Sequence, residues 1–586
     1  MKTRLHYLFI ALTLLALGNV ARSATITWTN TAGGNWNTAN NWNPNQVPGS
    51  SDDVLITSNG TYTVTLNIST TIASLTLGGA SGKQTLTNDG SALALINPSV
   101  VNTNGILSLN GNILSGLTVN GRFNWNGGVL DPGSSLTIAT NGVMNILGSV
   151  NLYSALTNQG TVNWQSGTIG VYNYVGDGDT GEIWNQAGAL WDIQCDQSFN
   201  AFVNVQFHNA GTVRKSAGTG TTLIYVIFAN AGTVQAQTGT IQFYGGGNLD
   251  ASYQANAGAA IYFGAGTFTI GSTPNLQGPG AVGVGGGVPI ITGTLACPLN
   301  FYANSGLNPG SSLTIATNGV MNILGSVNLF GVLTNQGTVN WQSGAIGVNN
   351  FDGEGYTGEI WNQAGALWDI QCDQSLNAPY GSGQFHNAGT VRKSAGTGTT
   401  LIYVIFANAG TVQAQTGTIQ FYGDYTETSS ANILFTPGGP NAGSDFGQIN
   451  FGTAPAFAGQ FTISMRNGFR PSPGTSFSVL SYPSATGDLT SMNGLDLGSG
   501  LQLVPQLSGT GLTLLAAAYA ANAQPSLSVY PTLNGVLLSW PLSYTGWQLD
   551  MTTNLATHIW TPVTLAGTNS TIVPRTAQGY FRLESN

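Results

Sequence analysis

Two pairs of carboxylates have a spacing that could support acid–base chemistry. Asp192 and Asp196 lie in the segment Trp191-Asp192-Ile193-Gln194-Cys195-Asp196, and Asp369 and Asp373 occupy the same places in a second copy. On a β-strand, residues four apart share one face, so each pair would point the same way. Enzymes that cleave glycosidic bonds use two such carboxylates as acid and base. At roughly 13–14 Å along an extended strand, however, the pair is wider than an inverting enzyme needs, and solvated or turn-capping carboxylates are the alternative.

An acidic, glycine-rich loop spans residues 177–182. Asp177, Asp179 and Glu182 place oxygen ligands at alternating positions, which suits Ca²⁺. The second copy has Tyr356 in place of Asp179, and neither loop follows the complete EF-hand pattern. A flexible acidic loop is the alternative, and no other cofactor is expected.

Tryptophans near the N-terminus offer a surface for sugar binding. Trp36 and Trp42 could form a platform for pyranose rings, because sugars stack on aromatic faces. The alternative is that they seal the open end of a repeat array, which otherwise exposes apolar surface and unpaired backbone.

Histidine and cysteine are scarce. A histidine-dependent nucleophile would have to use His208 or His386, which are one position in two copies, and exposed or turn-bonded histidine is the alternative. Cys195, Cys297 and Cys372 are expected to be small buried side chains. Cys195 and Cys372 are also equivalent positions, so stacking would keep them too far apart for a disulfide.

Most of these residues lie in a block of sequence that occurs twice, at 130–245 and 307–423. The copies differ by fifteen substitutions and one inserted residue. In and around the first copy, an Asn followed within three residues by Gly and then by an apolar strand recurs every 16 to 28 residues. That spacing is the length of one coil of a β-solenoid. Asn and Gly both tolerate the positive φ of tight turns, and Asn side chains can stack in ladders from coil to coil.

The sequence therefore predicts an all-β protein, an elongated β-solenoid (parallel β-helix) with an N-terminal cap and a small C-terminal β-sandwich. Charged residues make up only 6% of the chain and 82 residues are glycine, which suits stacked strands better than amphipathic helices. The predicted parts are a signal peptide at 1–23, the cap at 24–85, the solenoid at 86–423, its strand-rich end at 424–515, a linker at 516–525 and the C-terminal module at 526–586.

Export is expected from residues 1–23, which combine basic residues, an apolar run at 8–17 and small residues before Ala24. The run is too short to span a bilayer, so no transmembrane segment is expected in the mature chain.

Cleavage would leave ten basic residues against 22 acidic ones, so nucleic acid and anionic membranes are poor partners. The basic pairs Arg214-Lys215 and Arg392-Lys393 are expected to be polar positions that point outward, and the alternative is that they bind an acidic glycan.

Three regions carry a resemblance to known proteins. The first tryptophans with Val47-Pro48-Gly49 and Asp52-Asp53-Val54 resemble the opening of large secreted β-solenoid proteins of Gram-negative bacteria. Residues 425–480 are similar to the strand-rich region that follows the solenoid in autotransporter-like passengers. The end of the chain, with Leu538-Ser539-Trp540 and Tyr580-Phe581-Arg582-Leu583, resembles C-terminal modules of the same kind of protein and a fibronectin type III pattern. The resemblance implies an exported, adhesin-like protein without known catalysis.

The sequence thus predicts a non-catalytic adhesin or extended structural spacer, located outside a Gram-negative cell or on its outer surface. Extracellular polysaccharide or a neighbouring cell surface is the expected partner. The alternative is a polysaccharide lyase or glycoside hydrolase on a β-helix, using Asp192 and Asp196 or their copies. A third hypothesis is a carbohydrate-binding protein with Trp36 and Trp42 as its platform.

Overall fold

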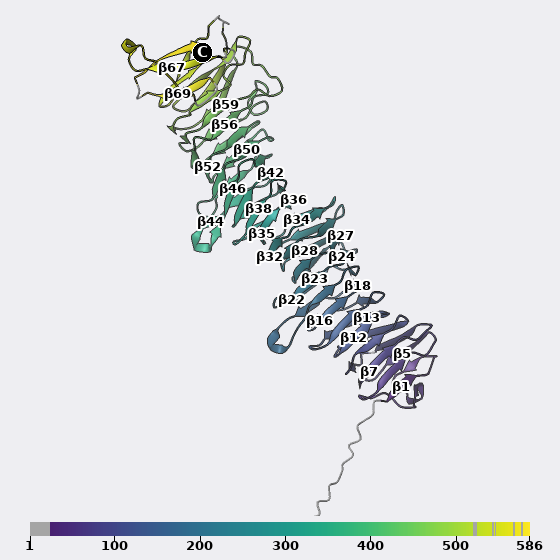
Figure 1. Ribbon diagram of the computed structural model, residues 1–586. Coiled ribbons are helices and arrows are strands. Elements are labelled where there is room, and N and C mark those ends of the chain that lie inside the picture. The colour runs from purple at the N-terminus through teal and green to yellow at the C-terminus, as the bar shows by residue number, and fades with distance from the viewer. Residues whose placement is uncertain are drawn as a thin grey trace, which may run out of the picture. The chain divides into compact units, whose positions relative to one another are not determined.

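The computed structural model describes residues 24–88, 90–519, 524–541, 544, 546–565, 569–575 and 578–585. The predicted signal peptide at 1–23 lies outside these residues. The protein is nearly all β, with 53% strand and 2% helix, and forms a parallel β-solenoid of about 18 turns with small antiparallel sheets near its C-terminus (Figure 1). The predicted fold class is confirmed. The chain divides into two compact units, Met1–Asp192 and Ile193–Asn586, which are described separately.

In the first unit, each coil contributes short strands that stack on those of the next coil. Leu136 pairs with Leu156 and Met144 pairs with Val162, so apolar residues repeat in register. Alternate residues are buried because successive side chains of a strand point to opposite faces. The first-face sheet consists of β1 (Thr25–Trp28), β4 (Asp53–Ile56), β7 (Ser74–Leu77), β10 (Ser99–Val101), β12 (Gly116–Val119), β14 (Ser135–Ile138), β17 (Leu156–Asn158) and β20 (Ile183–Asn185).

The second unit continues the same pattern of parallel strands. Its first-face sheet consists of β23 (Gln206–Asn209), β26 (Ile227–Asn230), β29 (Gly247–Leu249), β32 (Thr267–Ile270), β35 (Ile290–Leu295), β38 (Ser312–Ile315), β41 (Val332–Asn335), β46 (Glu359–Asn362), β49 (Gln384–Asn387), β52 (Ile405–Asn408), β55 (Tyr425–Glu427), β58 (Ala456–Phe457) and β61 (Thr486–Gly487). This sheet therefore passes without a break into the second copy.

The other two faces shift by one strand just before the second copy. β34 (Ala281–Val284), the third strand of its coil, pairs with β36 (Pro298–Phe301), the second strand of the next coil. A new third-face sheet then begins with β37 (Ser305–Leu307) and β40 (Val327–Leu329). The coil formed by β35, β36 and β37, on which the second copy stacks, therefore joins the preceding coil through one aligned face and one offset face.

A ladder of buried asparagines runs through the second copy. Asn335, Asn362, Asn387 and Asn408 end successive strands, and the Nδ2 of each donates to the Oδ1 of the next at 2.8 Å. Asn408 ends the ladder by donating to the Tyr425 hydroxyl at 3.0 Å. The ladder predicted from the Asn-Gly repeats is confirmed, and it satisfies amides that would otherwise be buried without partners.

The glycines after these asparagines have a different role from the predicted one. Gly160 and Gly337 do not adopt a positive φ, so the expected reason for glycine is wrong at these positions. A Cβ on Gly337 would lie 2.2 Å from the Ala316 carbonyl oxygen and 2.4 Å from that of Gly319. Glycine is needed there because successive coils approach too closely for a side chain.

The C-terminal end of the second unit is antiparallel. β63 (Leu501–Ser508) and β64 (Gly511–Ala518) form a hairpin on β60 (Ser476–Ser481), so the predicted linker begins inside β64. The C-terminal module has two three-stranded sheets, formed by β65 (Ser528–Pro531), β66 (Gly535–Ser539) and β69 (Ser570–Pro574), and by β68 (Thr561–Pro562), β67 (Trp547–Thr552) and β70 (Tyr580–Ser585). Ser570 Oγ donates to the Met492 carbonyl at 2.8 Å, which ties the module to the last coil. Within the described ranges, no helix is long and apolar enough to cross a membrane.

Candidate functional site

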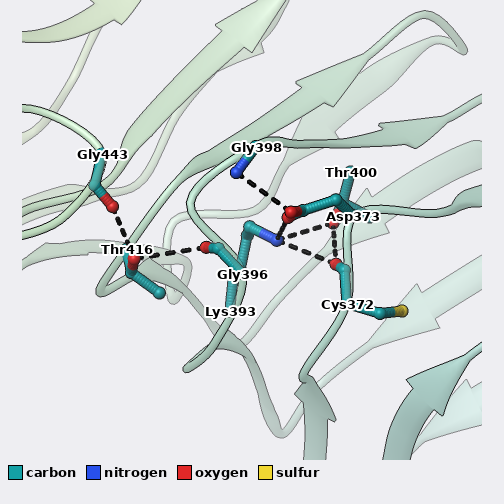
Figure 2. Close-up of polar contacts among 8 residues, drawn as sticks. All are labelled: Cys372, Asp373, Lys393, Gly396, Gly398, Thr400, Thr416 and Gly443. Atoms are coloured by element: carbon teal, nitrogen blue, oxygen red, sulfur yellow. Dashed lines mark hydrogen bonds and ion pairs between the residues drawn. The ribbon is translucent and has the colours of Figure 1, made fainter.

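Lys393 lies in the interior of the second copy. It is on β50 (Thr390–Lys393), on the same face as buried Val391, and its side chain is 0% exposed. Its Nζ donates to the Cys372 carbonyl at 2.8 Å, to Asp373 Oδ1 at 2.6 Å and to Thr400 Oγ1 at 3.0 Å (Figure 2). The prediction that this basic residue points outward is therefore wrong. The preceding coil and the next strand supply three oxygens that replace water around the ammonium.

Asp373 lies in the bend between β47 (Leu367–Ile370) and β48 (Ser375–Asn377), with its side chain 38% exposed. Its Oδ2 also accepts a hydrogen bond from the backbone N–H of Gly398 at 3.0 Å. A Cβ on Gly396 or Gly398 would lie 2.3 Å or 2.8 Å from the carboxylate oxygens. Two glycines thus make room for the carboxylate that neutralises Lys393.

The first copy repeats this arrangement. Lys215 Nζ donates to the Cys195 carbonyl at 2.8 Å and to Asp196 Oδ1 at 2.6 Å, and Gly220 donates to Asp196 Oδ2 at 3.0 Å. Burial raises the pKa of Asp196, but the hydrogen bonds from Lys215 and Gly220 outweigh it, so that pKa lies below its ordinary value. The predicted outward position of Lys215 is likewise wrong.

Asp369 binds a different cation. It pairs in register with Arg392, whose Nε donates to Asp369 Oδ1 at 2.9 Å, and Gln371 donates to its Oδ2 at 2.8 Å. Burial raises the pKa of Asp369, but the hydrogen bonds from Arg392 and Gln371 outweigh it and hold that pKa below its ordinary value. Asp192, the equivalent residue of the first copy, is buried on β21 (Leu190–Ile193).

The predicted pairing of Asp369 with Asp373 on one strand face does not form. β47 ends at Ile370, and Asp373 follows in the bend. Their cation partners, Arg392 and Lys393, are consecutive on β50 and leave opposite faces of that strand. A general acid must keep a proton at working pH, whereas the lowered pKa of Asp369 favours the carboxylate. The two acids therefore act as separate ion-pair partners.

Trp36 and Trp42 cannot serve as a sugar platform. Their side chains are 0% and 1% exposed, and their rings meet edge to face at 4.8 Å. Trp42 makes a second edge-to-face contact with Trp28, also at 4.8 Å, and its Nε1 donates to the Trp36 carbonyl. β1 pairs antiparallel with β3 (Trp42–Asn43), which folds this segment over the first coil. The platform prediction is wrong because the ring faces are covered, and the end-sealing alternative fits this packing.

The acidic loop does not assemble into a recognisable metal site. Asp177 ends the short helix η2 (Val175–Asp177) and is exposed, whereas Asp179 is buried and Glu182 is partly buried. Among the residues that the structure describes, no group of three or more His, Cys, Asp or Glu is arranged to hold a metal ion. The calcium prediction thus gains no geometric support.

The cysteines are unpaired thiols of intermediate burial. Burial raises the pKa of Cys195, Cys297 and Cys372, which disfavours the thiolate needed for nucleophilic chemistry.

His386 stacks on Trp361 with ring centroids 3.8 Å apart, and burial lowers its pKa. This histidine is part of an outer aromatic stack.

Stacked tyrosines on the outer surface are the feature that sequence reasoning missed. Tyr403 and Tyr422 stack with centroids 5.1 Å apart and planes 11° apart, and they are 44% and 46% exposed. Tyr225 and Tyr244 form the equivalent stack in the first copy, at 5.4 Å and 17°. Both pairs are separated by nineteen residues, one coil length. That recurrence was the signal that could have revealed an outward aromatic column.

The geometry describes a β-solenoid protein with paired interior charges and an aromatic outer surface. No family model matches the chain, and a search of curated proteins finds no match either.

Proposed function

We propose that this chain is a non-catalytic β-solenoid that works outside the cell as an adhesin or extended structural spacer and binds glycans through its outer surface. The observation that carries the proposal is the repeated stack of outer tyrosines, Tyr403 with Tyr422, both exposed, and Tyr225 with Tyr244, in which Tyr225 is exposed and Tyr244 partly buried. Contiguous exposed apolar surface marks interaction sites, and tyrosine combines an apolar ring with a polar tip.

The state of the candidate acids supports a non-catalytic role. Asp196 and Asp373 are hydrogen-bonded to buried lysines, and Asp369 is hydrogen-bonded to Arg392. A carboxylate committed to a cation is a weak base, and one with a lowered pKa is a poor acid. The lyase or hydrolase alternative therefore has no observation in its favour.

The proposal is tested by incubating the purified protein with a panel of neutral and acidic polysaccharides. Retention of polysaccharide and release of reducing ends or unsaturated products are measured on the same samples. Retention without product is expected. Product release that disappears after Asp192→Asn together with Asp369→Asn would overturn the non-catalytic assignment.

The adhesin role is tested in cells. Removal of the protein is expected to reduce attachment to surfaces that carry a retained polysaccharide. Unchanged attachment, combined with no retention of any polysaccharide by the purified protein, would overturn the proposed function.

A further inference from the structure

A hollow of about 470 Å³ opens on the outer face of the second copy beside Tyr403. We name it the Gly347 hollow. Its lining includes Asn328, Ala345, Gly347, Asn377, Pro379 and Tyr403. Its volume falls within the range of small-molecule binding sites, about 300–1,000 Å³.

The register of the third-face sheet explains the hollow. Asn328 on β40, Gly347 on β43 (Ile346–Val348) and Asn377 on β48 lie in line across three coils. Gly347 has no side chain, and the Oδ1 of Asn328 lies 2.5 Å from the position that its Cβ would take. On the next coil, the pairing of Leu376 with Ile402 places Tyr403 beside Asn377. Along the outer face, the order of residues is therefore an amide, a glycine, an amide and an aromatic ring.

Differences between the two copies fall at this hollow. Three of the fifteen substitutions fall here: Ala345 replaces Thr168, Asn349 replaces Tyr172 and Pro379 replaces Phe202. In the first copy, Tyr172 Cε2 lies 3.2 Å from the Cβ position of Gly170, the equivalent of Gly347, so the ring covers that glycine. In the second copy the neighbours of the Gly347 Cβ position are smaller groups, Pro379 Cγ at 3.4 Å and Asn349 Nδ2 at 3.5 Å, in place of a tyrosine ring. Each substitution replaces a larger residue with a smaller one.

The chemistry of the lining indicates the class of ligand. No lining residue carries a charge at neutral pH. Amides both donate and accept hydrogen bonds, which matches sugar hydroxyls, and a tyrosine ring suits the apolar face of a pyranose. Arg392 and Lys393 do not line the hollow and bind Asp369 and Asp373. A uronate carboxylate would thus find no cation in the hollow.

We propose that the Gly347 hollow binds a sugar unit of a neutral polysaccharide. Tyr403 stacks on the ring, and Asn328 and Asn377 exchange hydrogen bonds with its hydroxyls. The inference rests on the proposed glycan-binding function and assigns it to one site and one class of ligand.

The test measures binding of the full chain to soluble xylan, mixed-linkage β-glucan and galactomannan, and to polygalacturonate and alginate as acidic probes. Tyr403→Ala removes the aromatic face. Ala345→Thr combined with Pro379→Phe fills the hollow with the residues that the first copy already accommodates. Both variants are expected to weaken binding of a neutral polysaccharide by about tenfold or more.

The matched control is Thr168→Ala, which makes the reverse exchange in the first copy and is expected to leave affinity within about twofold. Tyr225→Ala removes the equivalent tyrosine of the first copy and is expected to weaken binding less than Tyr403→Ala does. Circular dichroism checks that every variant keeps its β structure.

One outcome is that the wild type, Tyr403→Ala and the variant with Ala345→Thr and Pro379→Phe bind a neutral polysaccharide equally well. That result would leave the proposed glycan-binding function standing but would overturn the proposal that the Gly347 hollow binds sugar. Equal loss in Tyr225→Ala and Tyr403→Ala, or binding of acidic probes alone, also overturns it. Failure of the wild type to bind any polysaccharide overturns the glycan-binding function itself.

Discussion

Removal of Asp373 is expected to destabilise the solenoid more than removal of Lys393, although the two residues form one ion pair. Asp373→Asn leaves a lysine of 0% exposure without its carboxylate. Uncompensated buried charges of this kind cost about 3–5 kcal/mol.

Lys393→Met leaves a carboxylate that water can reach, since the Asp373 side chain is 38% exposed. The Gly398 N–H still donates to that carboxylate, and the Thr400 hydroxyl still donates to the Cys372 carbonyl at 2.7 Å. The cost should therefore be about 1.5–3 kcal/mol, the range for losing a hydrogen bond to a charged group. The double variant should cost less than the sum of the two, because the residues are in direct contact.

The assay combines urea unfolding with hydrogen exchange at β50 and the strand after it, β51 (Thr399–Ile402). Hydrogen exchange is needed because coils contact only their neighbours, so unfolding of a long solenoid need not be two-state. Lys215→Met provides the matched control, since Lys215 has equivalent partners at 2.8, 2.6 and 2.9 Å. A Lys393→Met variant that loses as much stability as Asp373→Asn, or more, would refute the reasoning from unequal exposure.

Three further predictions address other parts of the fold. Asn362→Ala should cost about 1–3 kcal/mol, because it removes the partner of both neighbouring ladder amides; unchanged hydrogen exchange at Asn387 would contradict it. The lowered pKa of Asp369 means that its pairing with Arg392 stabilises the fold fully above the ordinary value of 3.8 and less as pH falls through the lowered pKa. The unfolding midpoints of wild type and Arg392→Gln should therefore converge below pH 3.8. A difference between the two midpoints that does not change with pH would contradict this prediction. Trp42→Ala should cost about 3–5 kcal/mol by leaving a cavity, with glycan binding retained by the folded fraction.

The solenoid could be predicted because its signals are local and repeated. The Asn-Gly units set the coil length, and alternation in segments such as Thr390–Lys393 sets the buried face. The same alternation predicts that Lys393 points inward, because it shares a strand face with buried Val391. Asp373 lies twenty residues earlier, one coil away, and could have been recognised as its partner. The general expectation that charged residues face water led to the wrong prediction for Lys393, although the spacing of the two residues in the sequence indicated the buried ion pair.

Other features depend on local geometry that composition does not encode. No glycine or proline marks the end of β47 after Ile370, so Asp369 and Asp373 looked like residues of one strand. The burial of Trp42 depends on the antiparallel return of β3 across β1, which repeat patterns do not describe. The Gly347 hollow requires the register of four coils at once, and no single segment of sequence contains that register.

The duplicated block separates residues that hold the coils together from residues that face solvent. In each copy the lysine Nζ lies 2.6 Å from the aspartate Oδ1, so the two copies share the same interior ion pair. A change at such a position disturbs interfaces with the coils on both sides, which makes it costly. Ala345 contacts the neighbouring coil through its backbone and lines the hollow, so a substitution of its side chain changes the surface at small cost in stability. A second copy can therefore acquire a hollow at Gly347 while its ladder and ion pairs remain intact, and this division of roles makes a duplicated solenoid block a suitable source of new binding surface.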